Sequence, residues 1–166
     1  MAVRAILKFP NPGLRVSAAR VDLFDEGLRQ LAEDLLDTMG AAQGIGITAP
    51  HIGVSKRLMV IQVSAEDAVK YYVNPQIVWA SADMLGHKEG SVSMQDVLEE
   101  IERPARVRVS YQDLSGTEHV EEADGLLCVC LQHEIDQLDG IFWTDRLSRL
   151  KRDRVIKRYE KVRRAS

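Results

Sequence analysis

The segment "DGLLCVCLQHEIDQLDG", residues 124–140, constrains the fold most strongly, because its apolar residues recur at helical spacing and the pattern closes on Gly140. Strand-like segments lie on both sides of it in the chain, without the regular alternation of strands and helices that marks a parallel sheet. The sequence therefore predicts an α+β fold in which antiparallel sheets pack around one central, buried helix.

The remaining segments give a coarse outline of this fold. An amphipathic helix is expected over residues 25–39, with Leu28, Leu31 and Leu35 on one face and Asp22 or Asp25 as its cap. A loop punctuated by Gly and Pro follows it. The other expected elements are strands at 57–63, 71–79 and within 106–116, a short strand or extended piece at 141–145, and a charged terminal helix at 147–164.

Length and composition are those of an ordinary globular protein. With 166 residues it fits a single domain, 1–166, whose last part (147–165) is the basic C-terminal helix. No apolar run approaches the roughly 20 residues that span a bilayer, so no membrane contact is expected. Cys128 and Cys130 are one residue apart and poorly placed to bond each other, which suits a reducing, cytoplasmic location.

Charge is distributed unevenly along the chain. Residues 1–145 hold 12 Lys and Arg against 23 Asp and Glu, a balance of −11, whereas residues 146–166 hold 10 against 2, a balance of +8. A basic tail on an acidic body indicates an anionic partner such as nucleic acid. The alternative is a helix whose charged face simply meets water.

Residues 133–137, "HEIDQ", fall one letter short of an H-E-x-x-H zinc-hydrolase motif. In that motif two His side chains one helical turn apart bind a metal ion, and the Glu between them acts as the general base on the metal-bound water. Gln137 stands where the second His is required. Without the second His, this fragment alone is only weak evidence for a metal site.

Two further stretches, "GIGITAPHIG" (44–53) and "EGSVSM" (89–94), together with "QHEIDQLDG", resemble the three signature motifs of the peptide deformylase family. The resemblance extends to "ILKFPNPGLRVSA", "YVNPQI" and "FWTDRLSRLKRDRVIK", in the order and spacing of the family. It implies the family's fold and its reaction, which is removal of the formyl group from N-terminal formyl-methionine with Fe²⁺ or a substitute divalent ion.

The departures from the family pattern fall on the metal site. The family's three ligands are one Cys and two His, and the matching positions here are Ser91, His133 and Gln137, of which only His133 is retained. If a full site contributes roughly 10–16 kcal/mol, losing two ligands costs about 6–8 kcal/mol, or roughly 10⁴–10⁶ in affinity. We therefore expect no metal cofactor. If the protein is active, a divalent Fe, Ni or Zn ion is expected.

The family's general-base residue is retained here, but one of its oxyanion-stabilising residues is replaced. Glu134 keeps the general-base position, although without a metal it has little to activate. The family stabilises the oxyanion with a Gln and a backbone N–H, and these positions are His51 and Val92 here. His51 either donates a hydrogen bond in place of the Gln, more strongly if protonated, or is a surface histidine without a role. A third option is that His51 joins His133 in a rebuilt metal site.

The resemblance also implies a pocket for the methionine side chain. Its positions match Ile45, Leu126, Leu127 and Cys130, with Gly46 allowing close approach of a peptide backbone. Glu89 is expected to brace the loop before Ser91. Arg103 either matches a family arginine or is a surface charge beside Pro104.

Three functions follow from these observations. The preferred one is a deformylase-like protein with little or no deformylase activity that binds nascent N-terminal peptides. The second is a working deformylase with a weakened or altered metal site, and the third is a metal-free hydrolase built on Ser91 with a His and Glu134. By resemblance, the basic C-terminal helix is expected to contact ribosomal RNA.

Overall fold

The computed structural model describes residues 2–165. Its α-helices are α1 (Glu26–Ala41), α2 (Gly125–Leu138) and α3 (Arg149–Ala165), and its strands are β1 (Gly46–Thr48), β2 (Leu58–Ile61), β3 (Lys70–Ala80), β4 (Met84–Ser91), β5 (Met94–Pro104), β6 (Arg106–Gln112) and β7 (Glu118–Asp124). Three short 3₁₀ turns complete it, at Pro12–Arg15, Ala49–Ile52 and Trp143–Arg146.

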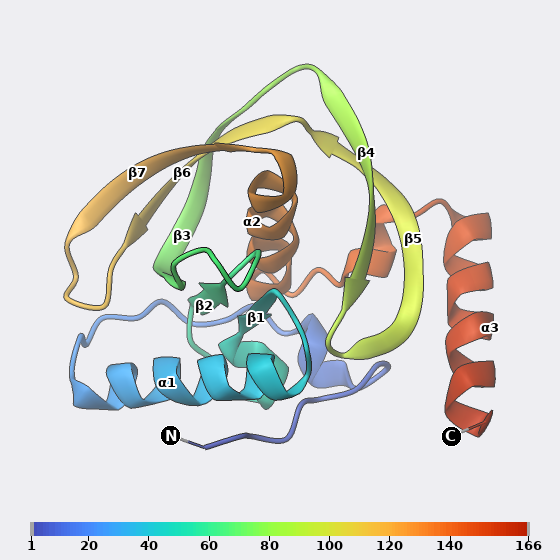
Figure 1. Cartoon of the computed structure of the whole chain (residues 1–166), viewed down its shortest axis with the longest axis horizontal. Helices are drawn as coiled ribbons and strands as arrows, with labels where there is room; N and C mark the ends of the chain where they lie inside the picture. Colours follow the sequence, from blue (N-terminus) through green and yellow to red (C-terminus); the bar gives the residue numbers. More distant parts are fainter. Residues whose placement is uncertain (1, 166) are drawn as a thin grey trace.

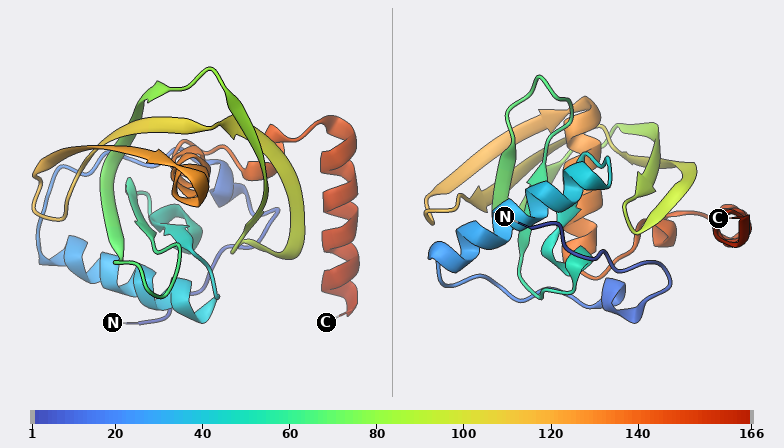
Figure 2. Two further views of the ribbon diagram at one scale, coloured as in Figure 1. Left: turned by 45° about the horizontal axis from the view of Figure 1, so that its top comes forward. Right: turned by 60° about the horizontal axis from the view of Figure 1, so that its bottom comes forward.

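The strands form two antiparallel sheets that enclose α2. One sheet has the order β1-β2-β3-β6-β7, and the other is the long β4–β5 hairpin. Figures 1 and 2 show α2 at the centre, with the five-stranded sheet on one side and the hairpin on the other. The predicted α+β arrangement around one buried helix is thus confirmed.

Helix α2 is buried on nearly every side, since 10 of its 14 residues are buried. Leu131 and Ile135 pack with the strand residues Val107 and Val109 in the core between α2 and the large sheet. The helix ends just before Gly140, whose φ of +77° suits only glycine without strain, and a Cβ there would lie 2.6 Å from the carbonyl oxygen of Arg15.

Helix α1 forms for the predicted reason. Of the two candidate caps, Asp25 is the one used, and its Oδ1 accepts the N–H of Leu28 at 3.0 Å. Leu28 and Leu35 are fully buried and pack with Ile47 and Leu58 of the neighbouring strands. Helix α1 therefore fixes the loop that leads from its end into β1, and this loop forms one wall of the site.

Helix α3 lies outside β5, at one edge of the molecule (Figure 1). Its inner side chains Val155 and Tyr159 are buried with Val97 of β5 and Trp143. The chain before it differs from expectation, because Trp143–Arg146 forms a 3₁₀ turn rather than a strand and the helix begins only at Arg149. Among residues 2–165, no helix is both long and apolar enough to cross a membrane.

Candidate functional site

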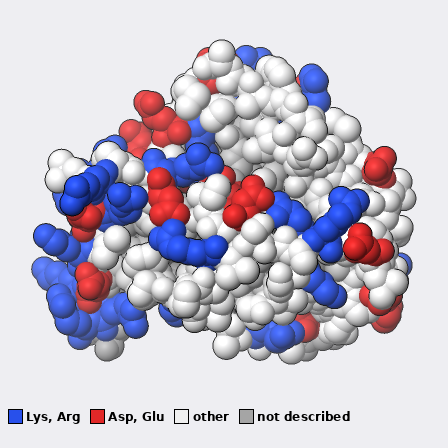
Figure 3. Space-filling view, turned by 180° about the vertical axis from the view of Figure 1, so that it is seen from behind, with Lys and Arg blue, Asp and Glu red and all other residues white. Residues whose placement is uncertain are grey.

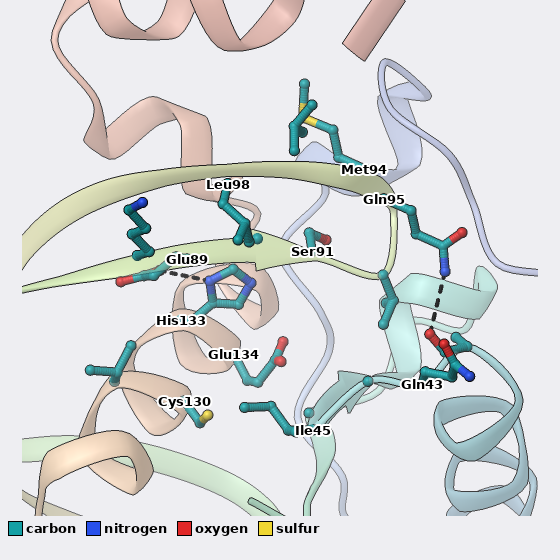
Figure 4. Close-up of a pocket in the computed structure, with 18 of the residues that line it drawn as sticks. Gln43, Ile45, Glu89, Ser91, Met94, Gln95, Leu98, Cys130, His133 and Glu134 are labelled. Atoms are coloured by element: carbon teal, nitrogen blue, oxygen red, sulfur yellow. Dashed lines mark hydrogen bonds and ion pairs between the residues drawn. The ribbon is translucent and has the colours of Figure 1, made fainter. Parts of the chain in front are cut away.

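A pocket of about 520 Å³ opens between the β4–β5 hairpin, the first half of α2 and the loop that follows α1. Figure 4 shows residues from all three elements facing this space. Of the positions identified in the sequence, the pocket is lined by Ile45, Gly46, His51, Glu89, Ser91, Val92, Leu126, Cys130, His133 and Glu134. Gln137 and Leu127 are not among the residues that line it.

His133 is held in place by a carboxylate. Its Nδ1 lies 2.8 Å from Oε1 of Glu89 on β4, the contact dashed in Figure 4. Burial opposes protonation of His133, but the negative charges of Glu134 and Glu89 outweigh it and raise the pKa of the imidazole. The predicted bracing role of Glu89 is therefore extended, because this carboxylate also orients a side chain of the pocket.

Behind Glu89 runs a buried chain of ion pairs. Arg103, only 5% exposed, donates to Glu89 from Nε at 2.6 Å and from Nη2 at 3.0 Å, and to Asp136 of α2 from Nη1 at 2.9 Å. Arg146 donates to Asp136 at 2.7 and 2.9 Å. Burial opposes ionisation of Glu89, but His133 and Arg103 outweigh it and lower its pKa. The alternative of Arg103 as a surface charge is wrong.

Gln137 is turned away from the pocket. Its Nε2 donates to the carbonyl oxygen of Leu14 at 2.6 Å, and the side chain is buried. A carbonyl can only accept, so the amide nitrogen must face Leu14. This hydrogen bond joins α2 to the 3₁₀ turn near the N-terminus.

Ser91 lines the pocket, and its Oγ accepts the backbone N–H of Ser93 at 3.0 Å. Within residues 2–165, neither His51 nor His133 hydrogen-bonds to it, because His51 bonds to Thr48 and His133 to Glu89. The Ser–His–Glu arrangement considered for a metal-free hydrolase is therefore not assembled. Across the same residues, no group of three or more His, Cys, Asp or Glu side chains is placed to hold a metal ion.

Glu134 faces the pocket with a buried, unsatisfied oxygen. The residue is 5% exposed, and its Oε1 has no hydrogen-bond partner among the described residues. The side chain packs on the backbone of Gly46, since a Cβ added there would meet Cγ and Cδ of Glu134 at 3.2 Å. Burial raises the pKa of Glu134 to about 6, with His133 and Arg103 opposing the rise and Glu89 adding to it.

His51 is buried in the wall of the pocket, so the alternative of a surface histidine is wrong. Its Nδ1 accepts the backbone N–H of Thr48 at 2.9 Å, which places the ring proton on Nε2. Burial and the nearby His133 lower the pKa of His51 to about 3, so the ring is neutral at physiological pH. Its Nε2 has no hydrogen-bond partner among residues 2–165, and because it carries the proton it is a neutral donor rather than a metal ligand.

The expected apolar lining is present with one exception. Leu126 and Cys130 line the pocket, whereas the half-buried Leu127 packs against the core between α2 and the large sheet. Successive helix residues are turned by about 100°, so the neighbour of a pocket residue faces elsewhere. Burial raises the pKa of the Cys130 thiol to about 12, which leaves it an inert, small apolar group.

Sequence reasoning missed several residues that line the pocket, among them Val129 and Leu98. Val129 lines the pocket one helical turn before His133, a position that the spacing within α2 could have revealed. Leu98 of β5 is 56% exposed and lies over the pocket near His133 (Figure 4). No signal in the sequence separates Leu98 from an ordinary exposed strand residue.

Sequence comparisons match this chain to one family of known proteins. The family model described as "Polypeptide deformylase" matches residues 3–153. A Brucella melitensis protein named "Peptide deformylase-like" is 63% identical over 99% of this chain and all of its own length. A Phenylobacterium zucineum protein named "Peptide deformylase" is 45% identical over 97% of each chain.

Solved structures of peptide deformylases are also similar to this chain. A peptide deformylase from Legionella pneumophila superposes with a TM-score of 0.93 at 38% identity, covering 99% of this chain and 97% of its own. The Ehrlichia chaffeensis peptide deformylase in complex with actinonin gives 0.91 at 36% identity, covering 97% and 98%. With both its sequence and its fold matching, the chain belongs to the polypeptide deformylase family.

Proposed function

We propose that this protein binds the N-terminal segment of a peptide in its pocket and has little or no deformylase activity. The observation that carries the proposal is the orientation of Gln137, whose amide is bonded to Leu14 rather than directed at the pocket. Of the three ligand positions of this metal-dependent family, His133 alone offers an imidazole.

The donor groups around the pocket do not fit the family's divalent ion. A catalytic zinc site takes three protein ligands and keeps one position for water. Here Ser91 offers a neutral hydroxyl that already accepts the N–H of Ser93. His51, which lines the pocket, carries its proton on Nε2, the nitrogen that would otherwise be free to bind a metal. Peptide binding is supported instead by the apolar side chains that line the pocket, among them Ile45 and Leu126.

Deformylation with a weakened metal site is the competing function. It is favoured by the 45% identity to a protein named "Peptide deformylase" and by the retained Glu134 in the pocket. The two functions predict opposite results for formate release.

The test is formate release from a formyl-Met tripeptide, with Fe²⁺, Ni²⁺ or Zn²⁺ supplied anaerobically and Glu134→Ala as the inactive control. We expect wild-type release no greater than that of the control, and metal-dependent release from the double variant Ser91→Cys, Gln137→His. The single variants show whether one restored ligand suffices. Metal-dependent release by the wild-type protein that is lost in Glu134→Ala would establish the competing function.

Helix α3 supports a proposal about the setting of this binding. Its 17 residues include nine Lys and Arg and only Asp153 and Glu160 as acids. Figure 3 shows blue side chains gathered at the edge of the molecule where α3 lies. We infer that this basic surface contacts RNA phosphates, as expected for a ribosome-associated protein.

The measurement for α3 is the affinity for ribosomal RNA at several salt concentrations. Each phosphate contact contributes about 0.7–0.9 to the slope of log K against log salt. Replacing Lys157 and Lys161 with Gln removes two exposed charges and should lower the slope by one to two. An unchanged slope would show that this face of the helix only meets water.

A further inference from the structure

Strand β7 leaves one edge of the large sheet unpaired. It is the last strand in the order β1-β2-β3-β6-β7 and, among residues 2–165, it pairs with β6 alone. The two strands keep one register from Arg106–Asp124 to Gln112–Glu118. Figure 1 shows β7 at the margin of the molecule. Alternate residues of β7 therefore direct their N–H and C=O groups away from the sheet, where another strand can bind them.

The side chains of β7 make this edge acidic. Its seven residues include four Asp and Glu, and no Lys or Arg. Glu121 and Glu122 form ion pairs with basic residues of β3 and β6. Glu118 and Asp124 are exposed, and neither has an ion pair among residues 2–165. These two carboxylates lie at opposite ends of the strand and, being six residues apart, on the same face of the sheet.

The middle of the edge offers apolar surface and space. Val120, on the same face as Glu118, is 64% exposed. A hollow of about 590 Å³ borders the strand at His119, Val120 and Glu121. An added strand can thus pack an apolar side chain against Val120 and place a neighbouring side chain in the hollow.

A second copy of this chain does not fit the edge. Antiparallel pairing of two β7 strands about Glu121 places Glu118 of one copy against Asp124 of the other. Like charges directly opposite each other destabilise a strand pair, and charged edges are a common protection against such self-association. The same two carboxylates favour an extended segment with basic residues at its ends.

We propose that the β7 edge binds an extended, basic segment of another protein as an additional strand. Main-chain hydrogen bonds hold the segment, two basic side chains lie opposite Glu118 and Asp124, and an apolar side chain lies beside Val120. Strand β7 contributes no residue to the pocket between α2 and the β4–β5 hairpin. The inference therefore stands independently of the proposed function.

The test is the affinity of labelled heptapeptides at low salt, measured by fluorescence anisotropy. The basic probe Lys-Thr-Val-Thr-Val-Thr-Lys, capped at both ends, has the same pattern in both directions and so fits either strand orientation. We expect it to bind about tenfold more tightly or better than Glu-Thr-Val-Thr-Val-Thr-Glu. Lys-Thr-Pro-Pro-Val-Thr-Lys keeps the charges, but two successive prolines remove an N–H that faces β7 in either register, so this peptide should lose a similar factor.

Charge reversal tests the side chains of the edge. The double variant Glu118→Lys, Asp124→Lys should lose the preference for the basic peptide and bind the acidic one more tightly. Glu100→Lys with Glu102→Lys, at exposed positions of β5, changes the net charge equally and should keep the wild-type ratio. Hydrogen exchange gives a direct readout, because an added strand should slow the exchange of amides in β7.

The outcomes that overturn the inference are specific. If the basic peptide does not bind at millimolar concentration, or if all three peptides bind equally, β7 does not recognise a basic strand. Exchange that slows only outside β7 has the same meaning. Self-association of the wild-type protein that is lost in the Glu118, Asp124 variant would show that the edge pairs with a second copy instead. The wild-type ratios are decisive even if a charge-reversed variant does not fold.

Discussion

Replacing His51 with Gln should make the protein less sensitive to acid. His51 is 1% exposed and its ring is neutral, with Nδ1 accepting the N–H of Thr48. Its pKa in the folded protein is about 3, because burial and the neighbouring His133 oppose a positive charge. A Gln side chain can accept the same N–H through its amide oxygen and takes up no proton.

The size of the effect follows from the two pKa values. In the unfolded chain His51 titrates near its ordinary pKa of 6.5, so between pH 6.5 and 3 the unfolded state binds the extra proton. The contribution to stability is therefore complete above about pH 7 and is lost as the pH falls. At pH 5 the loss is roughly 2 kcal/mol, and this figure depends almost entirely on the unfolded pKa.

The assay is urea unfolding followed by the fluorescence of the buried Trp143, at pH 7.5 and at pH 5. Between these conditions the free energy of unfolding should fall by about 2 kcal/mol less in His51→Gln than in the wild-type protein. His87→Gln, an exposed histidine on β4, is the control and should follow the wild type. Equal losses in wild type and His51→Gln would refute the neutral, buried state of His51.

Three further perturbations test the site. Arg103→Leu leaves the carboxylate of Glu89 buried without its main partner and should lower the free energy of unfolding by about 3–5 kcal/mol in urea titrations. Gly46→Ala drives a methyl group into Glu134 and should lower the thermal midpoint, whereas Gly40→Ala, which meets nothing within 4 Å inside α1, should raise stability by up to about 1 kcal/mol. Glu134→Gln removes a carboxyl whose pKa is raised from 4.5 to about 6, so it should raise the free energy of unfolding by about 2 kcal/mol at pH 7.5 and leave it unchanged near pH 4.

The two helices that frame the core were predictable because their patterns are local. Leu28, Leu31 and Leu35 recur at helical spacing, and the cap lies beside them in the sequence. The β4–β5 hairpin was missed for a physical reason. Met94 and Val97 of β5 are both buried although they are three residues apart, because an irregularity near Asp96, with φ +70°, breaks the alternation expected of a strand.

The sequence motifs predicted which residues form the site, but not which partners these residues contact. The motifs located His51, Ser91 and Glu134, and all three line one pocket. The partner of Gln137 could not be predicted, because the carbonyl of Leu14 is 123 residues away in the chain. The burial of His51 could not be predicted either, since it depends on how the loop after β1 packs beneath the pocket.

At the two positions where the resemblance implies other metal ligands, the side chain of this protein has a hydrogen-bonded place in the fold. Gln137 satisfies a buried carbonyl, and Ser91 accepts the N–H of Ser93. The connection between hairpin and helix runs instead through Glu89, Arg103 and Asp136, which bind one another without a metal. We therefore predict that folding of this protein requires no ion and that a chelator leaves its thermal midpoint unchanged. By the same reasoning, restoring His at position 137 removes the partner of the Leu14 carbonyl at a cost of about 1–3 kcal/mol. A recovered metal site would therefore have to offset this loss by binding.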